Sequence, residues 1–203
     1  MIASVDFSEW MDYNAAQTAR EVRPLLLDAL TAAGPGAGRQ AVDLGCGLGR
    51  ESDALLRAGW RVHAVDFAPN TEENLHATTR EQDRERLTVE VRSFADLAGL
   101  PDADLVYAGF SIPYIPRDVF DRLIGVVRTA VRPGGLFAAN LLGVNDGYRA
   151  EHGEEFTFLD EDEVRSLLFP GWDLVRLDIE DYDGRAYSGP HHWHLFHLVA
   201  RRP

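Results

Sequence analysis

The chain is poor in cysteine, in basic residues and in long apolar runs, and each shortage excludes a class of protein. Its single cysteine, Cys46, cannot form an internal disulfide and cannot by itself build a zinc site. No apolar run approaches the roughly 20 residues needed to cross a bilayer, and the start MIASVDFSEW lacks the basic and apolar segments of a signal peptide. We therefore expect a cytoplasmic protein without disulfides and without a membrane partner.

Acidic residues outnumber basic ones, at 33 against 20, which gives a formal net charge of -13. Such a chain repels a phosphate backbone unless basic residues gather on one face, and the sequence shows no basic cluster. Between Glu151 and Asp183 the excess of acidic residues is sharper still. That stretch predicts either a solvated acidic surface or a rim that favours a cationic substrate. We expect no nucleic acid partner.

Apolar runs alternate with helical patterns, which predicts an α/β fold on a mostly parallel sheet with helices on both faces. The expected strands are 40–45, 61–67, 87–93, 104–111 and 136–143, and the expected helices are 13–30, 49–60, a polar one ending near 86, 117–131 and 160–169. Two extended segments, 172–181 and 191–202, predict an antiparallel pair joined by the turn DYDGRAYSGP.

The length of 203 residues suits one domain with one substantial core. We expect residues 1–203 to form this domain in three parts. Residues 1–33 would supply an N-terminal lid and helix, residues 39–140 a cofactor-binding core, and residues 141–203 the substrate-side part.

A glycine-rich turn follows the first expected strand. In VDLGCGLGR, Gly45, Gly47 and Gly49 lie between this strand and a helix, where open α/β sheets bind their ligands. Without a Cβ, these residues let the chain bend tightly and let its amides approach a nucleoside. Asp43, just before the turn, can help orient a cationic amine. Cys46 is interpreted as a small filler rather than a nucleophile, because no basic partner lies near it in sequence.

An acidic residue at the end of the second strand supports a nucleoside site. Asp66 can accept hydrogen bonds from both ribose hydroxyls, and the following Phe67 can pack on an adenine face. Phe94 and Asp96 follow the third strand. Asp96 is either an acceptor for the adenine amino group or a surface residue of a polar turn.

The spacing of the glycines weighs against a dinucleotide cofactor. Counting from Gly45, the third glycine of a Gly-x-Gly-x-x-Gly fingerprint would fall at position 50, where the sequence has Arg50. An NAD-dependent oxidoreductase is therefore disfavoured.

With these residues placed, the sequence resembles the class I S-adenosylmethionine-dependent methyltransferases, especially small bacterial enzymes of the tellurite-resistance type. The motifs VDLGCGLGR, AVDFAP, DLVYAGFSIPYI and VRPGGLFA carry the resemblance through most of the chain. It implies a Rossmann-like, doubly wound sheet of seven strands with an antiparallel last strand, and S-adenosyl-L-methionine as cofactor. The residues that we assign to the cofactor are Asp43, Gly45, Cys46, Gly47, Gly49, Asp66, Phe67, Phe94, Asp96 and Phe110.

The methyl acceptor is expected beside the end of the fourth strand. Methyl transfer is an in-line displacement, so alignment and exclusion of water supply most of the acceleration, and a base is needed only when the nucleophile carries a proton. Tyr114, in FSIPYIP, is either a catalytic group or plain pocket lining. His191 or His192, near the last turn, is a second candidate base.

The C-terminal histidines do not predict a metal site. On a strand, His192 and His194 share one face while His191 and His197 point the other way, and no cysteine lies near them. We expect methyl transfer to a small-molecule oxygen, nitrogen, sulfur, selenium or tellurium nucleophile. The alternative is a non-catalytic sensor or partner-binding protein that binds S-adenosylmethionine or its demethylated product. The sequence indicates no oligomeric state.

Overall fold

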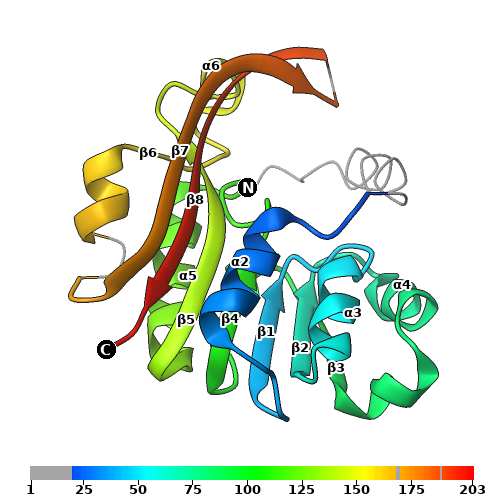
Figure 1. Ribbon diagram of the computed structural model, residues 1–203. Coiled ribbons are helices and arrows are strands. Elements are labelled where there is room, and N and C mark those ends of the chain that lie inside the picture. The colour runs from blue at the N-terminus through cyan, green and yellow to red at the C-terminus, as the bar shows by residue number, and fades with distance from the viewer. Residues whose placement is uncertain (1–19, 168–169, 188) are drawn as a thin grey trace.

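The chain folds around one twisted, mostly parallel sheet. The structure, a computed structural model, describes residues 20–167, 170–187 and 189–203. In these residues seven strands follow the order β3-β2-β1-β4-β5-β8-β7, and β6 pairs with β5 off that path (Figure 1). β8 runs antiparallel to its two neighbours, β5 and β7, and the other described strand pairs are parallel. The strands are β1 (Gln40–Leu44), β2 (Arg61–Asp66), β3 (Leu87–Val91), β4 (Ala103–Ala108), β5 (Val131–Gly143), β6 (Phe158–Leu159), β7 (Asp173–Ala186) and β8 (Gly189–Arg201).

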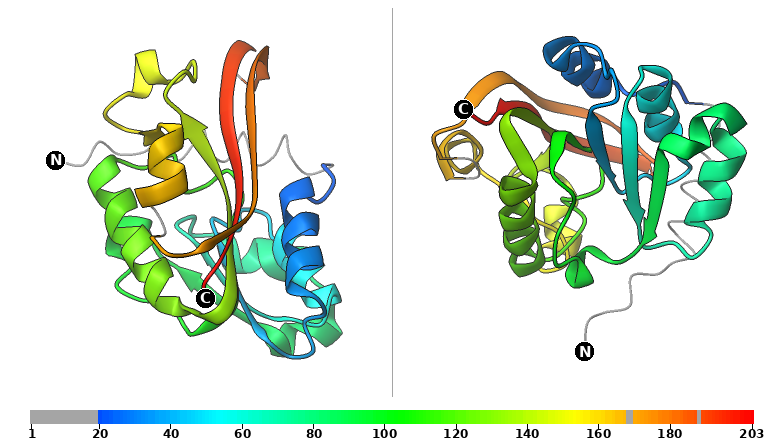
Figure 2. Two further views of the ribbon diagram at one scale, coloured as in Figure 1. Left: turned by 60° about the vertical axis from the view of Figure 1, so that its left-hand side comes forward. Right: turned by 90° about the horizontal axis from the view of Figure 1, so that it is seen from below.

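Helices cover both faces of the sheet, as the sequence predicts. Leu26 of α2 and Leu55 of α3 are fully buried against one face, and Phe120 of α5 is fully buried against the other. The view from below in Figure 2 shows α2 and α3 on one side of the strands and α5 on the other. The α-helices are α2 (Pro24–Ala33), α3 (Arg50–Arg57), α4 (Thr71–Thr78), α5 (Arg117–Ala130) and α6 (Arg149–His152), with η1 (Glu81–Arg86), η2 (Phe94–Asp96) and η3 (Glu163–Leu167) as shorter helical turns.

The parallel strands bring their carboxyl ends to one edge of the sheet. β1 is paired with β2 on one side and with β4 on the other, so the order of the strands reverses at β1. Ligands of open α/β sheets bind at such a reversal, outside the carboxyl ends of the strands. The fold therefore places the loops after β1, β2, β3 and β4 around one crevice.

The sheet has eight strands in the described residues, and the prediction of seven is wrong in this detail. The additional strand is β6, in which Phe158 and Leu159 pair in parallel with Leu142 and Gly143 of β5. Two residues are too few to show the alternation by which a strand is recognised in a sequence.

The C-terminal hairpin is longer than the sequence indicates. DYDGRAYSGP predicts a turn, but β7 continues to Ala186 and β8 begins at Gly189. Gly184, read as a turn signal, lies inside the strand, and a Cβ there would come within 2.9 Å of the Tyr182 ring and 3.2 Å of the Trp193 ring. This glycine therefore serves side-chain packing across the hairpin rather than a turn.

The first expected helix is only partly described. Residues 1–19, which include most of the expected lid, lie outside the described residues, and α2 begins at Pro24. Arg23 before it is extended, with φ -64° and ψ 138°. A proline disfavours the helical conformation in the residue that precedes it, so the helix begins here.

The late helix starts with the expected cap. The Glu163 amide donates to Asp160 Oδ1 at 2.8 Å, and the Asp160 amide donates to Glu163 Oε2 at 3.0 Å, which is a capping box. The expected helix continues as η3, a π-helical turn. Among the described helices, none has the length and apolar character needed to span a membrane.

A core substitution on β8 tests the packing of the antiparallel strand. Phe196 is fully buried, and its cross-strand partner Ile179 on β7 is 39% exposed. We expect Phe196→Ala to lower the free energy of unfolding by about 3 to 5 kcal/mol in urea titrations, because it leaves a cavity in the core. Ile179→Ala, the matched control, should lose less than half as much. Equal losses would contradict this description of the core.

Candidate active site

The glycine turn after β1 is held against the end of β2. The amides of Gly45 and Cys46 both donate to the Val65 carbonyl, at 2.8 and 3.2 Å, and the Gly49 amide donates to the Cys46 carbonyl at 2.8 Å. Gly45, Gly47 and Gly49 have φ values of 73°, 52° and 81°, a region that favours glycine. The loop therefore has the tight turn that the sequence predicts.

Two of these glycines are also required by contacts within the protein. A Cβ on Gly45 would lie 2.2 Å from the Ser111 Cβ, and a Cβ on Gly49 would lie 2.4 Å from a methyl of Leu75. Sequence reasoning attributes the glycines to the approach of a nucleoside, whereas these two also let the loop pack on the end of β4 and on α4. Cys46 is a buried free thiol, and burial raises its pKa well above the ordinary value.

Asp66 lies directly beside the glycine turn. Its carboxylate accepts the Gly47 amide at 2.9 Å and the Ala68 amide at 3.1 Å. Burial raises the pKa of Asp66, and these backbone hydrogen bonds partly offset the rise. Phe67 follows with its side chain 40% exposed. The structure thus brings together two motifs that are about twenty residues apart in the sequence.

Asp43 is buried beneath the turn instead of lining it. It is 1% exposed, and Ser52 donates a 2.6 Å hydrogen bond to its Oδ2. Burial raises the pKa of Asp43 to about 7, and the hydrogen bond from Ser52 opposes the rise. The role expected for Asp43 at a ligand amine is therefore not a direct contact in this arrangement.

A second buried acid ties α3 to the segment before α2. Glu51 forms a bidentate ion pair with Arg20, and it accepts the Arg23 amide at 3.2 Å. Burial raises the pKa of Glu51, but the hydrogen bonds and charge of Arg20 outweigh it and hold this pKa below its ordinary value.

Phe94 and Asp96 lie in η2, which follows β3 at the same edge as Asp66. Phe94 is half-buried and packs on the core, whereas Asp96 is exposed. Both are therefore placed at the ligand edge, with Asp96 open to solvent.

An aromatic cluster lies beyond the ends of β4 and β5. We call it the aromatic wall, and its rings are in contact through centroid distances of 4.1 to 6.5 Å. Its members are Phe110, Tyr114, Tyr148, Phe156, His191 and Trp193. The Arg23 guanidinium lies 4.6 Å from the Phe110 ring centre. Phe110 has a φ of 51°, a strained conformation for a residue with a side chain, which is typical of functional sites.

His191 is held by a buried carboxylate that the sequence analysis missed. His191 Nε2 lies 2.9 Å from Asp146 Oδ1, and both side chains are buried. Asp146 also accepts the amides of Tyr148 and His194, each at 3.1 Å. The segment GVNDG after β5, rich in turn residues, was the signal that could have indicated a structured loop here.

His192 faces the other way. Successive residues of a strand point to opposite faces, and His192 contacts Asp183 at 2.8 Å and Asp181 at 2.9 Å instead of the aromatic wall. The hydrogen bond to Asp183, followed by that to Asp181, raises the pKa of His192. The described residues contain no group of three or more side chains arranged to hold a metal ion.

Comparisons with known proteins find a methyltransferase domain in this chain. Residues 42–137 match a family model described as a methyltransferase domain. A stretch of 60 residues is 38% identical to the ubiquinone biosynthesis O-methyltransferase of Ralstonia nicotianae, and it covers 29% of this chain but only 25% of that relative.

Two solved structures share the fold. TehB from Haemophilus influenzae has a TM-score of 0.72 at 16% identity, over 96% of this chain and 67% of that one. The 1,6-didemethyltoxoflavin-N1-methyltransferase of Burkholderia thailandensis, solved with its substrate and S-adenosylhomocysteine, has a TM-score of 0.71 at 21% identity, over 96% of this chain and 84% of that one.

Residues 42–137 thus match a methyltransferase domain, and the chain shares the fold of a methyltransferase solved with S-adenosylhomocysteine. Both findings support the resemblance to class I S-adenosylmethionine-dependent methyltransferases that the sequence indicates, and S-adenosylmethionine, the predicted cofactor, is the cofactor of that class. The described residues fit it, because a buried carboxylate, Asp66, and an exposed phenyl ring, Phe67, stand beside the glycine turn.

The raised pKa of Asp43 gives a prediction about stability. An acid whose pKa is higher in the folded state than in the unfolded state stabilises the fold at low pH, and this contribution is lost as the pH rises from about 4 to 7. Asparagine does not titrate, so Asp43→Asn should not show this loss. The free energy of unfolding of the variant, relative to wild type, should therefore rise over that range by at most about 1.4 kcal/mol per pH unit. Denaturant unfolding of the unliganded protein at several pH values measures the difference. Asp118→Asn, exposed on α5, should show none.

Proposed function

We propose that the protein transfers a methyl group from S-adenosylmethionine to a small-molecule acceptor. The main support for this proposal is the hydrogen bond between Gly47 and Asp66, because it brings a glycine turn and a carboxylate together at one edge of the sheet. When bound, S-adenosylmethionine supplies a methyl group to the lone pair of a nucleophile, by in-line displacement that leaves S-adenosylhomocysteine.

The described residues divide the binding of the cofactor between them. Gly47 presents backbone to the ligand, Asp66 accepts hydrogen bonds from ribose hydroxyls, and Phe67 offers an exposed ring to the adenine. We assign Asp96, which is exposed in η2, to the adenine amino group. Asp43 acts at one remove, through Ser52 and the start of α3.

The aromatic wall suits the acceptor side of the reaction. It continues from Phe110, at the end of β4, and consists of planar side chains that exclude water. Tyr114 lies edge-on to Phe156, with ring centres 5.2 Å apart, so it lines this wall. A small planar molecule fits such a surface better than a nucleic acid does, given the net charge of -13. The Burkholderia methyltransferase, solved with the small molecule 1,6-didemethyltoxoflavin bound, supports the same class of acceptor.

We propose His191 as the base and not His192, because His192 points away from the aromatic wall. Asp146 accepts a hydrogen bond from His191 Nε2, which leaves Nδ1 as the atom that can take a proton from the acceptor. His191 also contacts Trp193 and Tyr148, with ring centres 4.3 and 4.1 Å apart, so it belongs to the wall.

Binding of the demethylated product tests the cofactor site. We expect wild-type protein to bind S-adenosylhomocysteine in calorimetry, and Asp66→Ala to weaken this binding about 10- to 100-fold, because it removes the charged acceptor for the ribose. Asp121→Asn, exposed on α5, should bind as wild type does. Undiminished binding by Asp66→Ala would overturn the assignment.

Turnover tests the base. With acceptors drawn from a panel of phenols, amines and thiols, we expect His191→Gln to lower S-adenosylhomocysteine formation about 100-fold or more for acceptors that must lose a proton, and far less for thiols that ionise near neutral pH. His192→Gln is the matched control and should keep wild-type rates. The assignment fails if both variants lose the same activity, or if His191→Gln slows every acceptor equally.

A further inference from the structure

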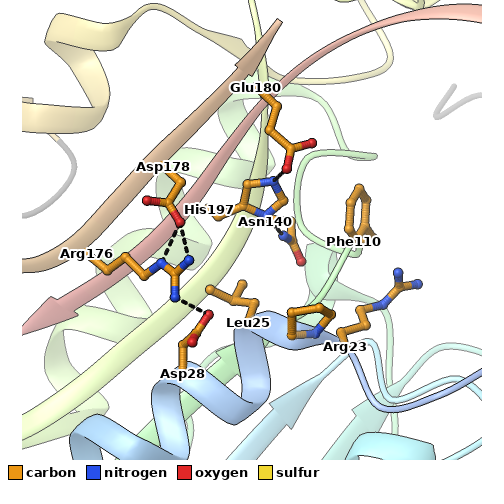
Figure 3. A pocket seen from close by; sticks show the side chains of 10 residues that line it. Arg23, Leu25, Asp28, Phe110, Asn140, Arg176, Asp178, Glu180 and His197 are labelled. Carbon is orange, nitrogen blue, oxygen red and sulfur yellow. Dashed lines mark hydrogen bonds and ion pairs between the residues drawn. The ribbon is translucent and has the colours of Figure 1, made fainter. Parts of the chain in front are cut away.

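A pocket opens between α2 and the β5-β8-β7 side of the sheet (Figure 3). Its volume is about 160 Å³. Side chains of α2, the end of β4, and strands β5, β7 and β8 line it, and the ones used below are Arg23, Phe110, Asn140, Arg176, Glu180 and His197. Phe110 belongs both to this pocket and to the aromatic wall.

Two buried polar atoms in the pocket have no hydrogen-bond partner in the part of the chain that the structure describes. They are Asn140 Oδ1 and His197 Nε2. Asn140 is only 2% exposed. Figure 3 shows its amide among the pocket side chains, between His197 and Phe110. Buried polar groups in folded proteins are almost always satisfied, so an unpartnered buried carbonyl indicates a ligand or a bound water.

The hydrogen bond between Asn140 and His197 fixes which groups are acceptors. The Asn140 amide nitrogen donates to His197 Nδ1 at 2.7 Å. The neutral imidazole therefore carries its proton on Nε2, which faces Glu180 Oε1 at 3.4 Å. The Asn140 carbonyl and the Glu180 carboxylate remain as acceptors, so the pocket suits a ligand that donates two hydrogen bonds.

The pocket adjoins the cofactor edge through two links. Phe110 is followed by Ser111, whose hydroxyl donates to the Leu44 carbonyl at 2.6 Å and whose Cβ packs on Gly45. The Arg23 amide donates to Glu51 in the first turn of α3. A ligand in this pocket therefore lies next to the turn that we assign to the methyl donor.

The volume of the pocket and the charges of its side chains restrict which ligands can bind. A cavity of about 150 Å³ holds a benzene molecule, so this pocket holds a single six-membered ring. Arg176 is neutralised by Asp28 and Asp178, each at 2.5 Å. Arg23 lies over the Phe110 ring, and with Glu180 the lining has two positive and three negative side chains, so it favours a hydrogen-bond donor over an anion. A methyl acceptor must also keep a free lone pair, which an ammonium ion lacks, so a neutral ring with a donor group meets these conditions.

We propose that this pocket binds the methyl acceptor, and that the acceptor is a single-ring aromatic primary amine whose two N–H groups are received by Asn140 and Glu180. The proposal rests on the proposed methyltransferase function. In such a methylation the nitrogen lone pair forms the N–CH₃ bond as the S–CH₃ bond of the donor breaks, and the donor leaves as S-adenosylhomocysteine. The nitrogen then loses one proton to the Glu180 carboxylate, which for an acceptor in this pocket takes the place of His191 as the base. Asn140 and Glu180 are then specificity-determining residues.

Matched small probes test the pocket. Aniline, phenol and toluene have the same ring and nearly the same size, but they offer two, one and no hydrogen-bond donors. In ligand-observed NMR with protein saturated by S-adenosylhomocysteine, we expect aniline to bind about tenfold more tightly than toluene, with phenol between them, because the buried carbonyl is satisfied only by a donor. Phenol binding as tightly as aniline would overturn the assignment to an amine.

Substitutions at Asn140 and Glu180 test whether these two residues cause the preference for aniline over toluene. Asn140→Leu, of similar volume, should abolish the preference for aniline over toluene, and Glu180→Gln should reduce it without changing toluene binding. The matched control is Leu141→Val, which lies on the same strand with its side chain on the opposite face and should keep the full preference. Thermal unfolding of each variant shows whether it is folded.

The outcomes separate this proposal from the one on which it rests. If S-adenosylhomocysteine binds but aniline and toluene bind alike, the pocket proposal is wrong and the methyltransferase proposal stands. If S-adenosylhomocysteine does not bind, the methyltransferase proposal fails, and an aniline preference in the unliganded protein that disappears in Asn140→Leu still supports an amine site. Loss of the preference in Leu141→Val to the same extent as in Asn140→Leu contradicts the pocket proposal.

Discussion

The close contact between Gly45 and Ser111 is the constraint on which the site depends. There is no room for a side chain at position 45, and the Ser111 hydroxyl donates back to the Leu44 carbonyl. The turn after β1 and the segment after β4 are thereby fixed to each other. Gly109 is constrained in the same way, because a Cβ there would lie 2.3 Å from the Tyr107 hydroxyl oxygen. Phe110, between the two contacts, adopts its strained conformation between the glycine turn and the pocket that α2 lines.

Buried charges beneath this contact hold the surrounding elements in place. Asp43 and Glu51 lie under the turn, and they differ in how their charge is compensated. Glu51 forms an ion pair with Arg20, whereas Asp43 accepts a hydrogen bond from the neutral Ser52 hydroxyl, and the pKa values of the two acids move in opposite directions for this reason. The contacts of Arg20 and Arg23 with Glu51 connect the chain before α2 to the first turn of α3. The position of α2, and of the pocket that it lines, therefore depends on the start of α3.

The proximity of the glycine turn and Asp66 could be predicted from the sequence because its signals are local. The glycine turn and Asp66 each stand at the end of an apolar strand, and parallel strands bring such ends together whatever their separation in the sequence. The eighth strand, β6, and the length of the hairpin were missed for the opposite reason. They depend on pairing with a distant strand, and neither a two-residue strand nor a glycine that packs under Trp193 carries a local signal.

Which histidine faces the aromatic wall depends on the register of β8, which explains why the sequence could indicate this segment but could not choose between its histidines. In β8 the residues alternate between the two faces of the sheet, and the pairing of Asn140 with His197 sets which face each residue takes. A slip by one residue would exchange His191 for His192 at the aromatic wall and would remove His197 from the Asn140 amide. The sequence offers both histidines equally, because nothing within HHWHLFH distinguishes one register from the other. The choice is made elsewhere, by apolar residues such as Phe196 and Leu198 that must face the core, and by the fit of the His194 ring over Gly143, where a Cβ would lie 2.1 Å from the ring. Which histidine reaches the aromatic wall is therefore a consequence of core packing on the far face of the same strand.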